Sequence, residues 1–441
     1  MKKTILLTIG LATAFNLFAG ETLQLQLVPE RGYVVKNAPQ EVVIKIDLSA
    51  IAGQKKIRRT PLNLAVVLDK SGSMTGAKLE KTKQAAMQLV DRLAPDDVFS
   101  LVIFSDKAQV LVSAQKVENK SALKEKIEGI EANGSTALYA GVKMGADQLQ
   151  EFFSSKRINR VILLSDGLAN VGPSSTPELR RLGSDLAERG MSVTTIGVGD
   201  DYNEDLMAGL AEASDANYYY VKDTEKLPEI FAKELGELLT VAARDVRIEI
   251  ICPDGVKPLG FIGRAEKFQD QKATVNLSQF TTGQDRYLFL RCLVNGDKPE
   301  VARVNVNYKD ELGDGSDQSA SGVARIDFTE DQKLSDQSLN GAVFAEKQLM
   351  LTAVAKDEAI AQADAGNYQQ AATILKAQSV ALNNSFAAAS PAVQSQIRAE
   401  TNNLDNFSGA IGGFGGGGGG GFDSATRKSL QEQSYNTRNS K

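Results

Sequence analysis

The stretch VVLDKSGSMTG (66–76) places one carboxylate and two hydroxyls within five positions, directly after an apolar run. Asp69, Ser71 and Ser73 alternate along the chain, so an extended backbone would direct all three side chains to the same side. Two interpretations are open at this point. The three oxygen-bearing side chains could hold a hard metal ion, or Ser73 or Thr75 could cap the helix that is predicted to follow.

Two further loops carry the same kind of side chain. RVILLSD (160–166) ends a second apolar run at Asp166, and NGSTALYAG (133–141) carries Thr136 just before a helical pattern. Taken alone, Thr136 is typical of a helix cap, and the SDG sequence is typical of a turn. The coincidence of three such loops in one chain favours a single metal site instead. Its predicted ligands are Asp69, Ser71, Ser73, Thr136 and Asp166.

The composition restricts the chemistry of that site. The chain of 441 residues contains no histidine and two cysteines. These counts exclude Ser-His-Asp and Cys-His catalysis, and also any histidine-ligated or four-cysteine zinc site. A metal held by this chain must therefore be a hard cation with oxygen ligands; Mg²⁺ is expected, with Mn²⁺ or Ca²⁺ as alternatives. The net charge of −5 gives no reason to expect a nucleic-acid partner.

Strands and helices alternate from residue 61 to residue 240 in a pattern that would position these loops. Nearly continuous apolar runs, typical of strands buried on both faces, are followed by amphipathic stretches typical of helices. The sequence therefore predicts an α/β fold, a doubly wound, mostly parallel sheet with helices on both faces. Ligands of such sheets bind at the carboxyl ends of the strands, where Asp69 and Asp166 are expected. The predicted strands are 62–69, 98–105, 160–166 and 191–199, with an antiparallel edge strand at 108–112 and a last strand at 217–221; the predicted helices are 77–93, 121–130, 138–153, 177–190 and 225–243.

The motifs DKSGS, GSTAL and LLSDG, in this order, resemble the metal-ion-dependent adhesion site of von Willebrand factor type A (VWA) domains. RTPLNLAVVLDKSGSM and VILLSDGLANVGP are similar to an exported bacterial branch that is often labelled after calcium-activated chloride channels or inter-alpha-trypsin inhibitor heavy chains. The resemblance implies that Ser71 and Ser73 ligate Mg²⁺ through their hydroxyls and that Thr136 ligates in the ligand-bound state. Asp69 and Asp166 would act directly or through water. A protein partner would then fill the open coordination position with an Asp or Glu.

The expected function is therefore metal-dependent protein binding, as in adhesion or scaffolding, and not catalysis. The competing hypothesis is a Mg²⁺-dependent hydrolase of phosphoesters or peptides, because two aspartates and Mg²⁺ also serve phosphoryl transfer. Against it, no second carboxylate stands two residues after Asp69, and the chain contains no GxxxxGK[ST] phosphate loop.

Alternating β patterns flank the α/β unit on both sides. Residues 21–60 and 241–332 are predicted to form one β-sandwich, into which residues 61–240 are inserted or onto which they dock. Residues 333–406 are rich in Ala and Gln with helical periodicity, so we expect a helical segment packed on the rest. Residues 407–441 are predicted to be a glycine-rich linker and a short polar tail, because glycine loses too much backbone entropy to hold a fold.

Residues 1–20 are interpreted as a signal peptide. Two lysines precede an apolar stretch, residues 4–18, that is too short to span a bilayer. A buried N-terminal helix or strand is the alternative. No later segment reaches the ~20 apolar residues that a membrane span needs. We therefore expect an exported protein without a membrane span, either periplasmic or secreted.

Export bears on the two cysteines. Cys252 and Cys292 both lie in strand-like runs, and an oxidising compartment permits a disulfide between them. Two unpaired thiols packed in a sandwich core are the alternative, and the sequence leaves both open.

Overall fold

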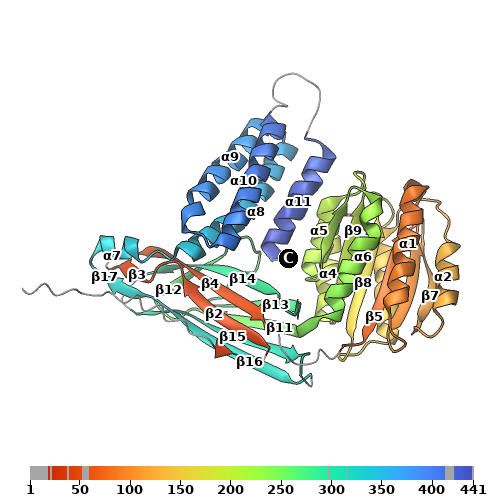
Figure 1. Cartoon of the computed structure of the whole chain (residues 1–441), viewed down its shortest axis with the longest axis horizontal. Coiled ribbons are helices and arrows are strands. Elements are labelled where there is room, and N and C mark those ends of the chain that lie inside the picture. The colour runs from red at the N-terminus through yellow and green to blue at the C-terminus, as the bar shows by residue number, and fades with distance from the viewer. Residues whose placement is uncertain are drawn as a thin grey trace, which may run out of the picture.

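The structure is a computed structural model, and it describes residues 18–19, 22–36, 39–51, 59–295, 298–313, 315–412 and 422–439. Figure 1 shows three bodies: an α/β unit with helices on both faces of its sheet, a pair of antiparallel sheets, and a group of long helices. The last helix, α11, lies between the helical group and the α/β unit (Figure 1). Within the described ranges, no helix is long and apolar enough to cross a membrane.

The α/β unit contains a six-stranded sheet in the order β10-β9-β8-β5-β6-β7. The strands from β10 to β6 are parallel, and β7 pairs antiparallel with β6 at one edge. The predicted doubly wound, mostly parallel sheet is therefore confirmed. Its strands are β5 (Leu62–Asp69), β6 (Val98–Phe104), β7 (Ala108–Lys116), β8 (Ile158–Ser165), β9 (Ser192–Val198) and β10 (Tyr218–Val221); its helices are α1 (Ala77–Arg92), α2 (Lys120–Glu128), α3 (Leu138–Glu151), α4 (Thr176–Glu188), α5 (Glu204–Ala213) and α6 (Leu227–Leu239).

Burial on both faces explains the apolar runs of these strands. Every residue of β5, β6, β8 and β9 is buried. Alternate residues of β5 enter two different apolar clusters, Leu64 and Val66 on one face and Ala65 and Val67 on the other. Because β5 and β8 are parallel neighbours, their carboxyl ends meet at the same edge of the sheet. That edge carries the loops that the sequence singled out.

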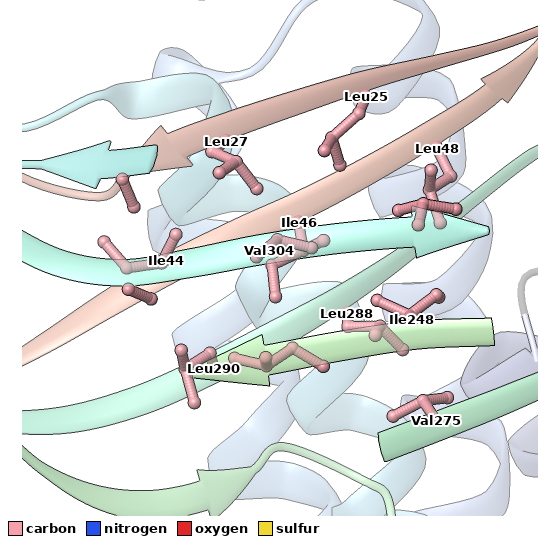
Figure 2. Packing of buried hydrophobic residues seen from close by; sticks show 14 of the residues in the cluster. Leu25, Leu27, Ile44, Ile46, Leu48, Ile248, Val275, Leu288, Leu290 and Val304 are labelled. Atoms are coloured by element: carbon pink, nitrogen blue, oxygen red, sulfur yellow. The ribbon is translucent and has the colours of Figure 1, made fainter. Parts of the chain in front are cut away.

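The second body is a sandwich of a five-stranded sheet, β1-β2-β4-β14-β12, and a four-stranded sheet, β13-β11-β15-β16. β4 precedes the α/β unit in the sequence, and it pairs with β14, which follows that unit. Strands from both flanks therefore share one sheet. In Figure 2, Ile46 and Leu288 of one sheet lie beside Val304 and Ile248 of the other. The strands are β1 (Phe18–Ala19), β2 (Leu23–Pro29), β4 (Gln40–Ala50), β11 (Val241–Ile251), β12 (Val256–Phe261), β13 (Lys272–Thr281), β14 (Asp285–Val294), β15 (Glu300–Asp310) and β16 (Asp317–Arg325); β3 (Tyr33–Val35) and β17 (Asp327–Thr329) form a separate parallel pair.

The helical group packs on the outer face of the five-stranded sheet. Val43 and Phe289 of that sheet form an apolar cluster with Val343 and Met350 of α8, so the sheet is covered on both faces. The helices are α7 (Gln332–Gln337), α8 (Gly341–Asp364), α9 (Tyr368–Asn384), α10 (Pro391–Gly412) and α11 (Ser424–Asn439). The predicted helical segment is thus present, and it packs on the rest of the protein as expected.

The structure corrects three details of the prediction. The predicted helix 225–243 is wrong at its end, because α6 stops at Leu239 and residues 241–243 begin β11. Helix α5 was not predicted from the sequence. The linker predicted from residue 407 begins too early, because α10 continues to Gly412; residues 413–421 lie outside the described residues.

The predicted polar tail is a helix, α11, held by contacts with distant elements. Leu430 and Tyr435 are fully buried, and the Tyr435 ring packs edge-on against Tyr218 of β10 at 5.6 Å. Arg427 pairs with Glu204 of α5 at 2.6 Å. The tail therefore gains its order from tertiary contacts rather than from its own composition. At the other terminus, β1 pairs with β2, and residues 1–17 and 20 of the predicted signal peptide lie outside the described residues.

Candidate metal centre

The loop after β5 brings three side chains to the carboxyl edge of the sheet. Asp69 is the last residue of β5 and is fully buried. Ser71 follows in an extended conformation, and Ser73 lies in a short 3₁₀ turn, Gly72–Met74. Gly76 has a φ of +85°, which lets the chain turn into α1 at little cost. The loop is therefore shaped by a tight turn and a glycine.

The hydroxyls of these loops do not act as helix caps. α1 has Gly76 at its N-cap position without a side-chain cap bond, and the Thr75 hydroxyl donates to Gly72 O at 2.7 Å. α3 begins after Ala137, again without a side-chain cap bond. The capping interpretation is therefore wrong for Ser73, Thr75 and Thr136, and another role must account for these hydroxyls.

Asp69 is buried with two hydrogen-bond donors. Ser71 N donates to Asp69 Oδ1 at 2.8 Å, and the Ser165 hydroxyl donates to Oδ2. Burial raises the pKa of Asp69 from 3.8 to about 6, although the hydrogen bonds from Ser165 and Ser71 oppose this shift; the carboxylate of Asp166 raises the pKa further. The ionised form of Asp69 is thus disfavoured in the metal-free fold, and a cation beside it would stabilise that form.

Ser73 joins the first loop to Asp166, which directly follows β8. The Ser73 hydroxyl donates to Asp166 Oδ1 at 2.7 Å and lies 3.1 Å from Ser71 Oγ. Asp166, like Asp69, is fully buried. Four of the five predicted ligands therefore form one cluster across the ends of two neighbouring strands.

Thr136 reaches the same cluster from the loop before α3. It is 4% exposed, and its backbone N donates to Asn170 Oδ1 at 2.9 Å. A Cβ added at Gly167 would lie 2.8 Å from Thr136 Oγ1 and 3.6 Å from Ser73 Oγ. Both hydroxyls therefore border Gly167, and the structure brings all five residues together.

Sequence reasoning missed a cation in this cluster. Lys78 Nζ lies 2.5 Å from Asp166 Oδ2, and the Asp166 side chain is 0% exposed while that of Lys78 is 26% exposed. Ser165 and Asn170, which fix Asp69 and Thr136, were also missed. The signal for Lys78 was its place in the first turn of the helix that follows DKSGS; Ser165 directly precedes Asp166 in LLSDG.

Comparison with known proteins identifies this α/β unit. The family model of the von Willebrand factor type A domain matches residues 63–233. These residues form a VWA domain. The family consists mostly of binding modules that are not enzymes, and such modules commonly serve protein binding and adhesion.

The similarity of this chain to other proteins extends beyond the VWA domain. The chain is 30% identical over 268 residues to uncharacterized protein sll0103 of Synechocystis, an alignment that covers 57% of this chain and 63% of that protein. It is 26% identical over 285 residues to uncharacterized protein YfbK of Escherichia coli, covering 62% of this chain and 49% of that protein. The chain thus spans about half to two thirds of the length of these relatives. Inter-alpha-trypsin inhibitor heavy chain H4 of Bos taurus is 33% identical over 129 residues, 27% of this chain and 14% of that one, so the predicted resemblance to these heavy chains is confirmed.

A solved structure has the same overall fold. The von Willebrand factor type A protein from Catenulispora acidiphila has a TM-score of 0.70 and 19% sequence identity, and covers 87% of this chain and 91% of its own. This likeness concerns the fold alone.

The oxygen atoms at the edge of the VWA domain fit a hard cation. Within the described ranges, no group of three or more His, Cys, Asp or Glu side chains could hold a metal ion. A metal here would therefore need hydroxyl ligands beside its carboxylates, and the cluster supplies three hydroxyls and two carboxylates. This set suits Mg²⁺, whereas Zn²⁺ prefers nitrogen and sulfur.

The two cysteines lie outside this site, in the sandwich. Cys252 and Cys292 are buried with their Sγ atoms 3.8 Å apart, as free thiols. The two thiols are thus neighbours, and the disulfide stays a prediction.

Proposed function

We propose that this chain is an exported protein-binding module whose VWA domain captures a partner carboxylate through Mg²⁺. The hydroxyls of Ser71, Ser73 and Thr136 would bind the ion directly, and Asp69 and Asp166 directly or through water. When bound, the ion supplies an electrophilic centre with a coordination position open to an Asp or Glu of the partner. The convergence of three loops supports this proposal, above all the contacts of Ser73 Oγ with Asp166 Oδ1 and Ser71 Oγ at 2.7 and 3.1 Å.

The charges of the cluster favour an acidic partner. Ionised Asp69 and Asp166 contribute two negative charges, and the Lys78 ammonium beside Asp166 contributes one positive charge. A divalent cation would turn this net charge of −1 into +1. Because the hydroxyl ligands are neutral, the excess positive charge remains available to attract a carboxylate at the rim of the domain.

The rim also offers an apolar contact. Leu168 follows Asp166 by two positions and is 57% exposed. A partner that places its carboxylate on the metal would cover this side chain, and the buried apolar area would add to affinity. Replacing Leu168 by alanine should therefore weaken partner binding and leave Mg²⁺ binding unchanged.

The test has two stages. Isothermal titration of the protein with MgCl₂ should give one site, which Asp69→Asn removes and which the exposed Asp91→Asn change retains. The immobilised protein should then capture a partner from envelope extract in the presence of Mg²⁺. EDTA should release this partner, and the Asp69→Asn variant should not bind it. No Mg²⁺ binding at millimolar concentration would refute the metal site, and capture that is insensitive to both EDTA and Asp69→Asn would refute the mechanism.

The hydrolase hypothesis is tested with the same proteins. Mg²⁺-dependent turnover of a phosphoester or peptide that is lost in Asp69→Asn and kept in Asp91→Asn would favour an enzyme. Export is tested separately: fractionation should find the protein in periplasm or medium, and mass spectrometry should show cleavage near residue 20. A cytoplasmic protein with an intact N-terminus would refute export.

A further inference from the structure

A large cleft lies at the other edge of the VWA sheet. The metal centre sits at the carboxyl ends of the strands, whereas this cleft is lined by the amino end of β8, at Ile158 and Arg160. Its volume is about 960 Å³. Its other walls come from α4, the end of α5, β11 and β13 of the sandwich, and the end of α11. In Figure 1 the end of α11 lies where the α/β unit meets the sandwich.

Arginine dominates the lining of this cleft. Seven arginines face five acidic residues, in a chain whose net charge is −5. The arginines are Arg157, Arg160, Arg180, Arg244, Arg247, Arg264 and Arg438; the acids are Glu188, Glu212, Asp215, Asp245 and Glu266. The sign of the charge in the cleft is therefore opposite to that of the whole chain.

Ion pairs neutralise only some of these arginines. Arg180 and Arg438 share Glu212, and Arg438 also pairs with Asp357. Arg244 pairs with Glu311 and Asp245, Arg264 pairs with Glu266, and Asp215 pairs with Arg286. Arg157, Arg160 and Arg247 have no ion pair with any carboxylate of the described residues. Glu188 is the one lining carboxylate without an ion pair in the same ranges, so positive charge is in excess.

Among these three arginines Arg160 is buried, whereas Arg157 is half-buried and Arg247 is exposed. Arg160 is 2% exposed, and it donates to the neutral atoms Thr194 Oγ1 at 3.3 Å and Gln279 Oε1 at 3.0 Å. Its Nε has no hydrogen-bond partner within the described structure. The Thr194 hydroxyl in turn donates to Glu234, so this carboxylate reaches Arg160 only through the hydroxyl. A buried guanidinium without a direct carboxylate partner is costly, and an anion in the cleft would compensate it.

Arg247 offers a second cation at the surface of the cleft. It is exposed on β11 opposite Asn276 of β13. The neighbouring carboxylate, Glu249, pairs with Lys272 at 2.6 Å and is thus already engaged. Arg157 uses one terminal nitrogen for the carbonyls of Leu62 and Asp96, 3.3 and 2.7 Å away, which leaves its other donors for a ligand.

We propose that this cleft binds a small multivalent oxyanion, a molecule that carries two or more phosphate or carboxylate groups. The planar guanidinium donates two parallel hydrogen bonds to either group, so several arginines around one cavity suit such a ligand. The volume matches that of small-molecule sites. Because Arg160 belongs to the VWA domain and Arg247 to the sandwich, the ligand would bridge the two and fix their relative orientation.

The test uses the full-length protein freed of divalent cations on a chelating resin, so that the metal centre plays no part and no soluble polycarboxylate chelator competes for the cleft. Calorimetric titration with pyrophosphate and with citrate should show saturable binding, and each should raise the melting temperature above that in KCl of equal ionic strength. Binding of pyrophosphate alone assigns the site to phosphate groups, and binding of citrate alone to carboxylates; either result supports the proposal. Asp69→Asn should bind both anions as the wild type does, so this result is independent of the metal proposal.

The variants decide whether binding occurs in the cleft. Arg247→Ala should weaken binding at least fivefold. Arg303→Ala should leave it unchanged, because Arg303 lies on β15 of the same sheet and pairs with Glu300 outside the cleft lining. Arg160→Met should abolish binding, and if that buried change prevents folding, the exposed Arg247 decides alone. Absence of any effect beyond that of KCl, or equal affinity of Arg247→Ala and wild type, would overturn the proposal.

Discussion

Replacing Asp69 by asparagine separates two effects of this residue: its proposed binding of the metal, and the destabilisation of the metal-free fold by its buried charge. The side chain is fully buried, and burial raises its pKa from 3.8 to about 6. A pKa that is higher in the folded than in the unfolded state means that the protonated carboxyl stabilises the fold. This contribution is complete below pH 3.8 and is lost as the pH rises through about 6.

The size of the effect follows from the shift. About two pKa units, at ~1.36 kcal/mol each, correspond to roughly 3 kcal/mol of unfolding free energy. Roughly half of this is lost by about pH 5 and the rest by about pH 7. Asp69→Asn cannot ionise, so it escapes the loss. The amide is a poorer acceptor for the Ser165 hydroxyl, at a cost of about 1 kcal/mol. In EDTA the variant should thus be about 2 kcal/mol more stable than the wild type at pH 8 and no more stable at pH 4.

Urea unfolding in EDTA from pH 4 to pH 8 measures this difference, with the exposed Asp91→Asn as the control for charge. MgCl₂ should then reverse the order at pH 8. Free Mg²⁺ at a hundred times its dissociation constant raises the unfolding free energy of the wild type by about 2.7 kcal/mol. The unfolding free energy of the variant should not change. Below pH 6 the apparent Mg²⁺ affinity of the wild type should fall about tenfold per pH unit, because the proton competes for Asp69. Equal pH slopes for wild type and Asp69→Asn in EDTA would refute the reasoning.

Three further changes probe other contacts. Lys78→Met should destabilise the metal-free protein by roughly 1–3 kcal/mol, because it leaves the buried Asp166 without its ammonium, and should tighten Mg²⁺ binding in calorimetry; Lys81→Met, which breaks the more exposed pair with Glu225, should do neither. Leu430→Ala should lower the first thermal transition by removing about 2–4 kcal/mol of packing beneath α11 and hasten proteolysis of the tail, whereas Gln431→Ala should not. Non-reducing peptide mapping of protein from an oxidising compartment should recover Cys252 and Cys292 as one disulfide, which would contribute roughly 4 kcal/mol; two alkylated thiols would contradict it.

The α/β unit could be predicted because its strands are buried on both faces. β5, β6, β8 and β9 are therefore continuous apolar runs, and this pattern is local to each strand. Boundaries were less predictable. A single residue, Thr240, separates α6 from β11, and no glycine or proline marks the change. The sequence VAA that follows suits either a helix or a strand, so pairing with β13 and β15 decided it.

The tail could not be predicted because its helix depends on residues far away in the sequence. The segment SATRKSLQEQSYNTRNSK has few apolar residues, with Leu430 and Tyr435 five positions apart rather than three or four. The partners of its charged groups lie on α5 and α8: Arg427 contacts Glu204, Asp205 and Asp364. The acidic partners of the tail come together only in the folded chain. The composition of the tail alone therefore does not predict its helix.

The same distinction explains which part of the metal centre was found. In a parallel sheet the carboxyl ends of neighbouring strands lie at the same edge, so residues that follow two such strands are expected to lie close together. Asp69 and Asp166 are placed in this way at the ends of β5 and β8. The orientation of Lys78 is not fixed in this way, since a lysine in the first turn of a helix can extend into solvent. Its contact with Asp166 forms because two fully buried carboxylates lie close together, and a nearby positive charge stabilises them. Sequence patterns thus locate the ligands of such a site, while its charge balance depends on how deeply the fold buries them.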